Sequence, residues 1–126
     1  MDKKTNIIEN AMILFNEFGF NGTPTSKIAK VSEISNGALF HYFPTKVELI
    51  NEIYWYVKSD LLSYFKANKV DSDNVIEQLF SFWRSLVKWA IINNDKFLFQ
   101  EQFLHSVYVK DSLKKKEMKH FNLLLM

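Results

Sequence analysis

Three side chains suited to contact with a partner lie within the stretch TSKIAKVSEISNGALFHYFPTK, residues 25–46. Asn36, Phe40 and His41 fall on the outward side of a predicted helix that begins at Ser35, whose hydroxyl can cap the free amides of the first turn. An amide, an aromatic ring and an imidazole would thus face away from the core. An ordinary helix of a bundle is the alternative, but it would leave Phe40 and His41 exposed without a purpose. The mixture indicates recognition of a partner by hydrogen bonds and apolar contacts.

Two short helices joined by a tight turn are predicted to position these side chains. Leu39 and Phe43, spaced four residues apart, form the inward face of the second helix. The first helix is predicted over residues 24–32, and its small Ala29 allows the close crossing that a helix-turn-helix requires.

A longer amphipathic helix is predicted before them, over residues 3–18. Its apolar residues recur at helical spacing: Ile7, Ala11, Leu14, Phe15 and Phe18. Gly19 can take the left-handed conformation that closes a helix, and Phe20 can fold back on Phe15. Thr23 is then a candidate N-cap, and Pro24 suits the first position of the next helix.

The remaining chain is also predicted to be helical. Thr45 and Glu48 form a capping box for a helix of some 20 residues, about 30 Å long, which is the natural connector to the rest of the chain. The polar run over residues 68–74 marks a boundary. Further helices are predicted at about residues 75–91, at 96–109 and from Asp111 onward.

The predicted fold is therefore all-α: a three-helix helix-turn-helix head, residues 1–46, joined by a long fourth helix to a helical bundle. We call residues 47–126 the body. The chain ends in the apolar block FNLLLM, which would need a partner surface, so we expect the body to be incomplete at its C-terminus.

Composition limits the possible functions. Hydrophobic residues make up 48% of the 126 residues, enough for a sizeable core. The absence of cysteine removes disulfides, thiolate zinc sites and cysteine nucleophiles. The net charge of +2, from 16 Lys and Arg against 14 Asp and Glu, is too small to identify a nucleic-acid partner by itself. No targeting segment or membrane span is recognisable, so a cytoplasmic protein without a membrane partner is expected.

Aromatic residues are dense in the predicted fifth and sixth helices. Core packing explains most of them, but their number also predicts a cavity for a small apolar or aromatic effector. The candidate lining residues are Tyr56, Leu62, Phe80, Trp83, Trp89 and Phe103.

Catalytic and metal-binding patterns are lacking in the sequence. No nucleophile stands with a base, no glycine-rich phosphate loop is present, and no His-Glu metal motif appears. His105 and His120 have no carboxylate at ligand spacing, so no metal, no cofactor and no enzymatic activity are expected. The lysines at residues 114–116 are best explained as a solvated helix face.

These motifs together resemble the N-terminal half of the TetR-type (TetR/AcrR family) bacterial transcriptional repressors. The resemblance rests on the first helix ending LFNEFGFNGT, the pair Ile28-Ala29, the segment ISNGALFHYFPTK, and a long helix with Glu48 and Leu49 near its start. It implies that the second helix of the motif lies in the major groove of double-stranded DNA, that the protein is a homodimer, and that the body binds a small molecule.

Carried over position by position, the resemblance implies a set of DNA-binding residues. Thr25 and Lys46 would contact phosphates, whereas the others would lie at the groove-facing start of the recognition helix or reach bases, sugars or phosphates. They are Thr25, Ser35, Asn36, Gly37, Ala38, Phe40, His41, Tyr42 and Lys46.

Three residues depart from the family pattern. Asn36 stands where Lys is frequent, which removes a charge but supplies an amide that can pair with adenine. Phe40 replaces the usual Tyr, so its contact must be apolar, for instance with a thymine methyl group. Glu33 occupies a turn position that is often Gly, which implies strain if its φ is positive.

The sequence thus predicts a ligand-responsive regulator, most simply a repressor, that binds a palindromic operator as a dimer. The alternative is a helical protein-interaction module whose helix-turn-helix no longer binds DNA.

Overall fold

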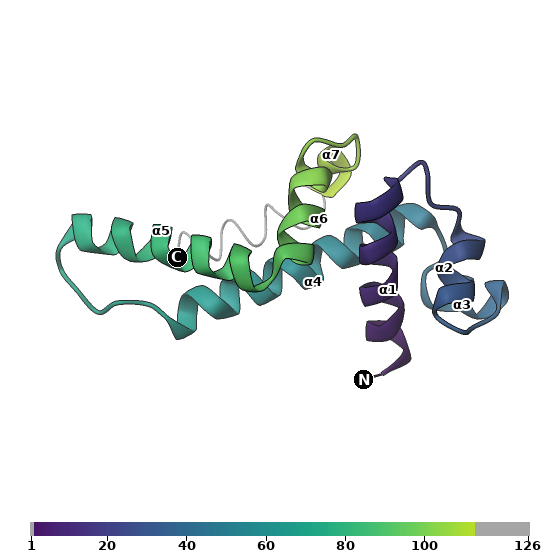
Figure 1. Ribbon diagram of the computed structural model, residues 1–126, viewed down its shortest axis with the longest axis horizontal. Helices are drawn as coiled ribbons and strands as arrows, with labels where there is room; N and C mark the ends of the chain where they lie inside the picture. The colour runs from purple at the N-terminus through teal and green to yellow at the C-terminus, as the bar shows by residue number, and fades with distance from the viewer. Residues whose placement is uncertain (1, 113–126) are drawn as a thin grey trace.

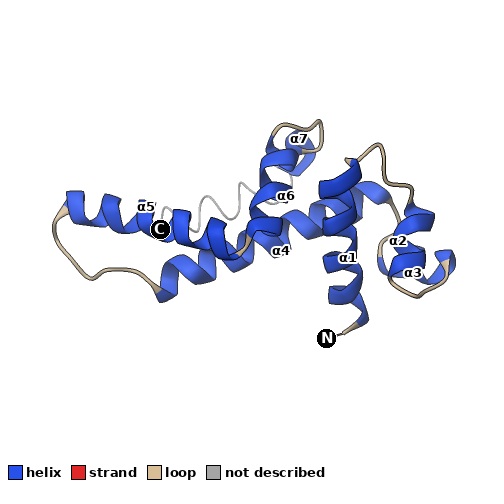
Figure 2. Ribbon diagram, in the orientation of Figure 1, coloured by secondary structure: helices blue, strands red, loops and turns tan. Residues whose placement is uncertain are grey.

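The computed structural model describes residues 2–112, which form seven helices and no strand (Figures 1 and 2). They are α1 (Lys3–Phe18), α2 (Thr25–Val31), α3 (Asn36–Tyr42), α4 (Lys46–Ala67), α5 (Val75–Ile92), α6 (Asn94–Leu104) and α7 (Val109–Ser112). α5 returns alongside α4, and α6 then contacts both α4 and α1 (Figure 1). The all-α prediction is confirmed for this range. The predictions for residues 114–126 lie outside the described residues.

Local interactions fix both ends of α1 where the sequence predicted them. Asp2 caps the first turn by accepting a hydrogen bond from the Thr5 amide at 2.7 Å. Gly19 closes the helix with φ +82°, and the ring of Phe20 lies edge-on to that of Phe15 at 5.2 Å. Gly22 is required for a different reason: a Cβ there would lie 2.1 Å from the Phe18 carbonyl oxygen.

The start of α2 differs from the prediction. Pro24, not Thr23, is the N-cap residue, and α2 begins at Thr25. The buried Thr23 hydroxyl instead donates to the Gly19 carbonyl at 2.7 Å and to the Leu14 carbonyl at 3.2 Å. The hydroxyl therefore bonds a carbonyl near the C-terminal end of α1 and the carbonyl of its C-cap residue, rather than the first amides of α2.

The long fourth helix begins as predicted. The Thr45 hydroxyl accepts a hydrogen bond from the Glu48 amide at 3.1 Å, which confirms Thr45 as the cap. α4 then continues for 22 residues, about 33 Å at 1.5 Å per residue. The polar boundary also follows the prediction, because Asn74 caps α5 by accepting from the Ile76 amide at 2.9 Å.

The sixth helix is shorter than predicted. The sequence indicated a helix to residue 109, but α6 ends at Leu104. The Ser106 hydroxyl donates to the Phe103 carbonyl at 2.6 Å and accepts from the Tyr108 amide at 3.2 Å. A serine side chain that bonds the nearby backbone in this way replaces the helical hydrogen bonds with a turn.

One hydrophobic core runs from the head into the body. Phe20 lies 5.7 Å from Phe99, Phe99 lies 6.4 Å from Phe103, and Phe103 stacks on Tyr54 at 4.1 Å between ring centroids. All four side chains are buried. The loop after α1, the inner side of α6 and the middle of α4 are therefore packed together, without a break at residue 46.

Two side-chain amides reinforce the contact between α1 and α6. Gln102 donates to the Phe15 carbonyl at 2.9 Å, and Asn16 donates to the Asp95 carbonyl at 2.8 Å. We call these two bonds, with the packing of Phe20 on Phe99, the α1–α6 joint. The predicted connector was α4 alone, whereas the structure joins head and body in two places.

α5 is packed very differently from α6. Among the described residues its buried side chains are Ser85 and Trp89. The other large apolar side chains along its length are mostly exposed: Val75, Ile76, Leu79, Phe80, Phe82, Trp83, Val87, Ile91 and Ile92.

Candidate nucleic-acid interface

The helix-turn-helix consists of α2 and α3, and buried apolar side chains hold the two helices. Ile28 and Ala29 of α2 and Leu39 of α3 are all buried, as the sequence predicted. The Ser35 hydroxyl caps α3 by accepting from the Ala38 amide at 3.0 Å. α3 is only seven residues long, so this cap and its anchored inner side define its direction.

The outer side of α3 carries the predicted contact residues. Asn36, Gly37 and His41 are exposed, and the Phe40 ring is 44% exposed. Large apolar side chains on a small polar helix are usually covered, so an exposed ring beside an amide and an imidazole is suited to contact with another surface.

Two of the predicted contact residues also take part in packing within the protein. Ala38 is half-buried, and the half-buried Tyr42 packs against the core. The His41 ring lies edge-on to that of Tyr42 at 5.8 Å. This contact restrains His41 on the surface while leaving it accessible.

The two predicted phosphate contacts stand at the starts of helices. Thr25 is the first residue of α2 and Lys46 the first residue of α4, and both are half-buried. The Lys46 ammonium lies 5.8 Å from the centre of the Phe15 ring, and burial lowers its pKa. Lys46 also lies beside the free amides of the α4 N-terminus, where an anion would be favoured.

Two further lysines of the head, Lys27 and Lys30, were not among the predicted contact residues. Lys27 and Lys30 line a shallow hollow on α2 together with Ser26 and Val31. The Lys27 ammonium lies 3.6 Å from the centre of the Phe18 ring. Their spacing of three residues in the first helix of the motif was the signal that could have identified them.

The turn between α2 and α3 is strained at one residue. Glu33 has φ +58°, the one positive φ of a non-glycine residue among the described residues. The strain foreseen for this position is thus present. The neighbouring backbone compensates for it, because the Ile34 amide still donates to the Ala29 carbonyl at 3.0 Å.

The residues predicted to line an effector pocket are dispersed. Trp89 and Phe103 are packed in the core, Tyr56 and Leu62 are half-buried, and Phe80 and Trp83 are exposed. An exposed ring cannot form the wall of an enclosed cavity within residues 2–112. The cause is the orientation of α5, whose apolar face is only partly covered by the described helices. A pocket formed by all six residues stays a prediction.

The described part of the chain offers neither a metal-binding cluster nor a membrane span. No group of three or more His, Cys, Asp or Glu side chains that could hold a metal ion occurs within residues 2–112. Over the same range, every helix is too short or too polar to cross a membrane.

Comparison with protein families identifies the head. Residues 7–53 match the family described as bacterial regulatory proteins, tetR family. The HTH-type transcriptional regulator QacR of Staphylococcus aureus is 43% identical over 53 residues, which cover 42% of this chain and 28% of that protein. An HTH-type transcriptional regulator of Bacillus subtilis, YuxN, is 42% identical over 60 residues, covering 46% of this chain and 21% of the relative.

Solved structures extend the similarity to the described part of the body. A tetR family transcription regulator from Shewanella sp. PV-4 superimposes with a TM-score of 0.85 at 29% identity, covering 92% of this chain and 62% of that one. A TetR family regulator from Marinobacter aquaeolei VT8 has the same fold, with a TM-score of 0.81 at 24% identity, covering 97% and 64%.

The matches span less than two thirds of the length of each of these relatives. These proteins are named as transcription regulators, in agreement with the prediction that the chain is not an enzyme. Taken with the geometry of α2 and α3, the matches show that residues 7–53 are similar to the tetR family of bacterial regulatory proteins, and that the described part of the chain has the fold of TetR family regulators.

Proposed function

We propose that the chain is a DNA-binding transcription regulator, most simply a repressor, that binds a palindromic operator as a homodimer. The observation that carries the proposal is the outer side of α3. An amide, a 44% exposed aromatic ring and an imidazole are displayed there by a helix whose inner side is anchored by Leu39. A DNA operator as partner would place the protein in the bacterial cytoplasm.

In the proposed complex α3 enters the major groove. The Asn36 amide can both donate to and accept from an adenine edge, and the Phe40 ring can contact a thymine methyl group. Ser35, Gly37 and Ala38 would allow close approach of the backbone at the start of α3. His41 and Tyr42 would reach a base, a sugar or a phosphate.

Phosphate contacts would come from both sides of α3. Thr25 and Lys46 stand at the starts of α2 and α4, and Lys27 and Lys30 add two positive charges on α2. These few charges give limited affinity to a single head. Two heads, with recognition helices about 34 to 36 Å apart, would bind successive major grooves at the same time. The dimer would therefore bind DNA more tightly than a single head.

Ligand response would act on the distance between the two heads. A small apolar or aromatic effector bound among α4–α7 would favour one orientation of the heads over the other. The α1–α6 joint supports this proposal, because a movement of α6 is carried to α1 by the bonds from Gln102 and Asn16.

Titration of fluorescent promoter fragments from the chain's own and adjacent genes, followed by anisotropy at several salt concentrations, tests the proposal. Lys46→Ala should weaken binding to every DNA sequence and lower the salt slope by about one unit, whereas the exposed Lys88→Ala of α5 should do neither. Asn36→Ala should relax the preference at one base pair by about 1–3 kcal/mol, with Asn94→Ala of α6 as its control.

The same titration separates the proposal from its alternative. If Lys46→Ala and Asn36→Ala both leave DNA affinity unchanged, the assigned reading face is wrong. An absence of any salt-dependent DNA binding would favour a protein-interaction module.

A further inference from the structure

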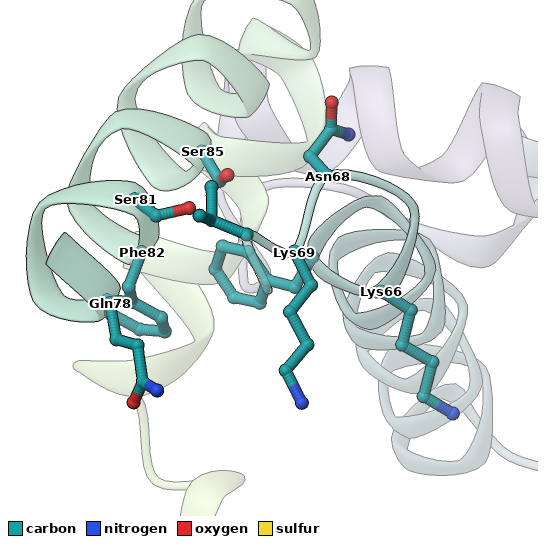
Figure 3. A pocket seen from close by; sticks show the side chains of 9 residues that line it. Lys66, Asn68, Lys69, Gln78, Ser81, Phe82 and Ser85 are labelled. Atoms are coloured by element: carbon teal, nitrogen blue, oxygen red, sulfur yellow. The ribbon is translucent and has the colours of Figure 1, made fainter. Parts of the chain in front are cut away.

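A pocket of about 270 Å³ lies between the C-terminal end of α4 and the first half of α5 (Figure 3). Its volume is near the lower end of the roughly 300–1,000 Å³ usual for ligand sites, which suits a small molecule. None of the six residues predicted from the sequence to bind an effector lines it. Its lining includes Phe65, Lys66, Lys69, Ser81, Phe82 and Ser85.

Two aromatic rings form the apolar part of the pocket. The rings of Phe65 on α4 and Phe82 on α5 lie 4.8 Å apart between centroids and are tilted by 32°. Phe65 packs against the core, whereas Phe82 is exposed. The two rings thus form an apolar surface in which the Phe65 ring is held by the core and the exposed Phe82 ring is free to adjust to a ligand.

Two hydroxyl groups stand on the α5 wall, one helical turn apart. Ser85 is buried, with 8% exposure, and Ser81 is half-buried. Both line the pocket. Both hydroxyls are open to the pocket, so a ligand oxygen bound there could accept a hydrogen bond that water would otherwise accept.

Two lysines provide positive charge at the edge of the pocket. Lys66 and Lys69 are exposed, lie at and just beyond the end of α4, and form no ion pair with another described residue. In Figure 3 the Lys66 and Lys69 side chains both extend away from Ser81 and Ser85. The site therefore combines an apolar floor, two hydroxyls and two cations.

We propose that this pocket binds a small amphipathic carboxylate, with an aromatic or short aliphatic body. The apolar body would lie on Phe65 and Phe82, and the carboxylate oxygens would accept hydrogen bonds from a lysine ammonium at the edge of the pocket. The inference extends the proposed function by naming the class of effector, but its test requires no DNA. A failure of DNA binding and a failure of this site are therefore distinguishable.

Isothermal titration calorimetry of the chain tests the site with a matched pair of probes, 3-phenylpropionate and its neutral analogue 3-phenylpropan-1-ol. The acid should bind once per chain and about fivefold more tightly than the alcohol, as expected for exposed charge pairs worth roughly 1 kcal/mol. The double variant Lys66→Met/Lys69→Met should remove that difference, whereas Lys88→Met should preserve it.

Substitutions in the α5 wall of the pocket test whether the acid binds there or elsewhere on α5. Ser85→Leu should abolish binding of the acid by filling the pocket, and Ser81→Leu serves the same purpose should the first variant fail to fold. Ile91→Ser, on the exposed face of α5, should leave affinity unchanged. Three results would overturn the proposal. They are equal binding of the acid and the alcohol, no saturable binding of the acid, and binding that is lost in Ile91→Ser but kept in both serine variants.

Discussion

The neighbouring helices α5 and α6 are both rich in aromatic residues, yet they bury them to opposite extents. Phe99 and Phe103 of α6 are 0% exposed, whereas Phe80 and Trp83 of α5 are each 61% exposed. α5 is nonetheless the more regularly amphipathic of the two. An apolar stripe therefore predicts that a helix has a face to cover, but not which partner covers it. α6 packs against both α1 and α4, whereas α5 contacts α4 and α6 but leaves most of its large apolar side chains exposed.

The largest expected effect tests this contrast directly. Phe99→Ala should lower the free energy of unfolding by about 3–5 kcal/mol, because it leaves a cavity in the core between Phe20 and Phe103. Phe80→Ala on α5 should change it by no more than about 0.5–1 kcal/mol. Urea unfolding followed by circular dichroism measures both. A similar loss for the two variants would mean that the exposed face of α5 is covered in solution.

A smaller effect is expected at the one large buried anchor of α5. The Trp89 indole nitrogen donates to the Asp60 carboxylate at 2.9 Å, and the Lys96 ammonium lies 3.1 Å from the same oxygen. Trp89→Phe should cost about 1–2 kcal/mol, because a charge-assisted hydrogen bond is lost while Asp60 stays paired with Lys96. Trp83→Phe is the matched control and should lie within about 0.5 kcal/mol of the parent. Equal costs would contradict the assignment of Trp89 as the anchor.

The α1–α6 joint is expected to contribute less per hydrogen bond. Gln102→Met should cost about 0.5–1.5 kcal/mol. The value stays small because the Phe15 carbonyl still accepts from the Gly19 amide at 2.8 Å, so no buried acceptor is left unpaired. The neighbouring Gln100→Met should have no measurable effect. A cost above about 3 kcal/mol would show that the joint depends on more than this bond.

The smallest effect concerns alkaline pH. Burial, together with a hydrogen bond to the Glu9 carboxylate, raises the pKa of the Tyr56 hydroxyl to about 12. An unfolded tyrosine has a pKa of about 10. The contribution of protonated Tyr56 is therefore complete below about pH 10 and is lost as the pH rises toward 12. Thermal unfolding at pH 9 and pH 11 should show a smaller decrease in Tm for Tyr56→Phe than for the parent chain. An identical decrease would contradict the contact between α4 and α1 at this residue.

Features set by near neighbours in the chain were predictable from the sequence. The caps at Ser35 and Thr45 and the closing conformation of Gly19 depend on groups within four residues, and the structure confirms all three. Thr23 was assigned wrongly because its hydroxyl had two sets of backbone groups within reach. The sequence does not show whether this hydroxyl bonds the carbonyls at the end of α1 or the amides at the start of α2.

Features that depend on distant parts of the chain were not predictable. The bond from Gln102 to Phe15 joins residues 87 positions apart, and no local pattern marks either partner. The exposure of Phe40 and His41 could be foreseen from their register with Leu39, although their contact with DNA stays a prediction. The pocket of Ser81 and Ser85 was missed, but two hydroxyls one turn apart on an aromatic-rich helix are a usable signal.

The α1–α6 joint also bears on how the chain folds while it is being synthesised. The first helix emerges from the ribosome early, but its partners Asp95 and Gln102 follow 79 and 87 residues later. Until then the carbonyl end of α1 and the ring of Phe20 lack the surface on which they pack, and closing such a long loop slows the final step. The nascent head therefore becomes fully stable only after α6 has been synthesised. If a ribosome stalled before residue 103, the first helix would stay exposed and prone to aggregation.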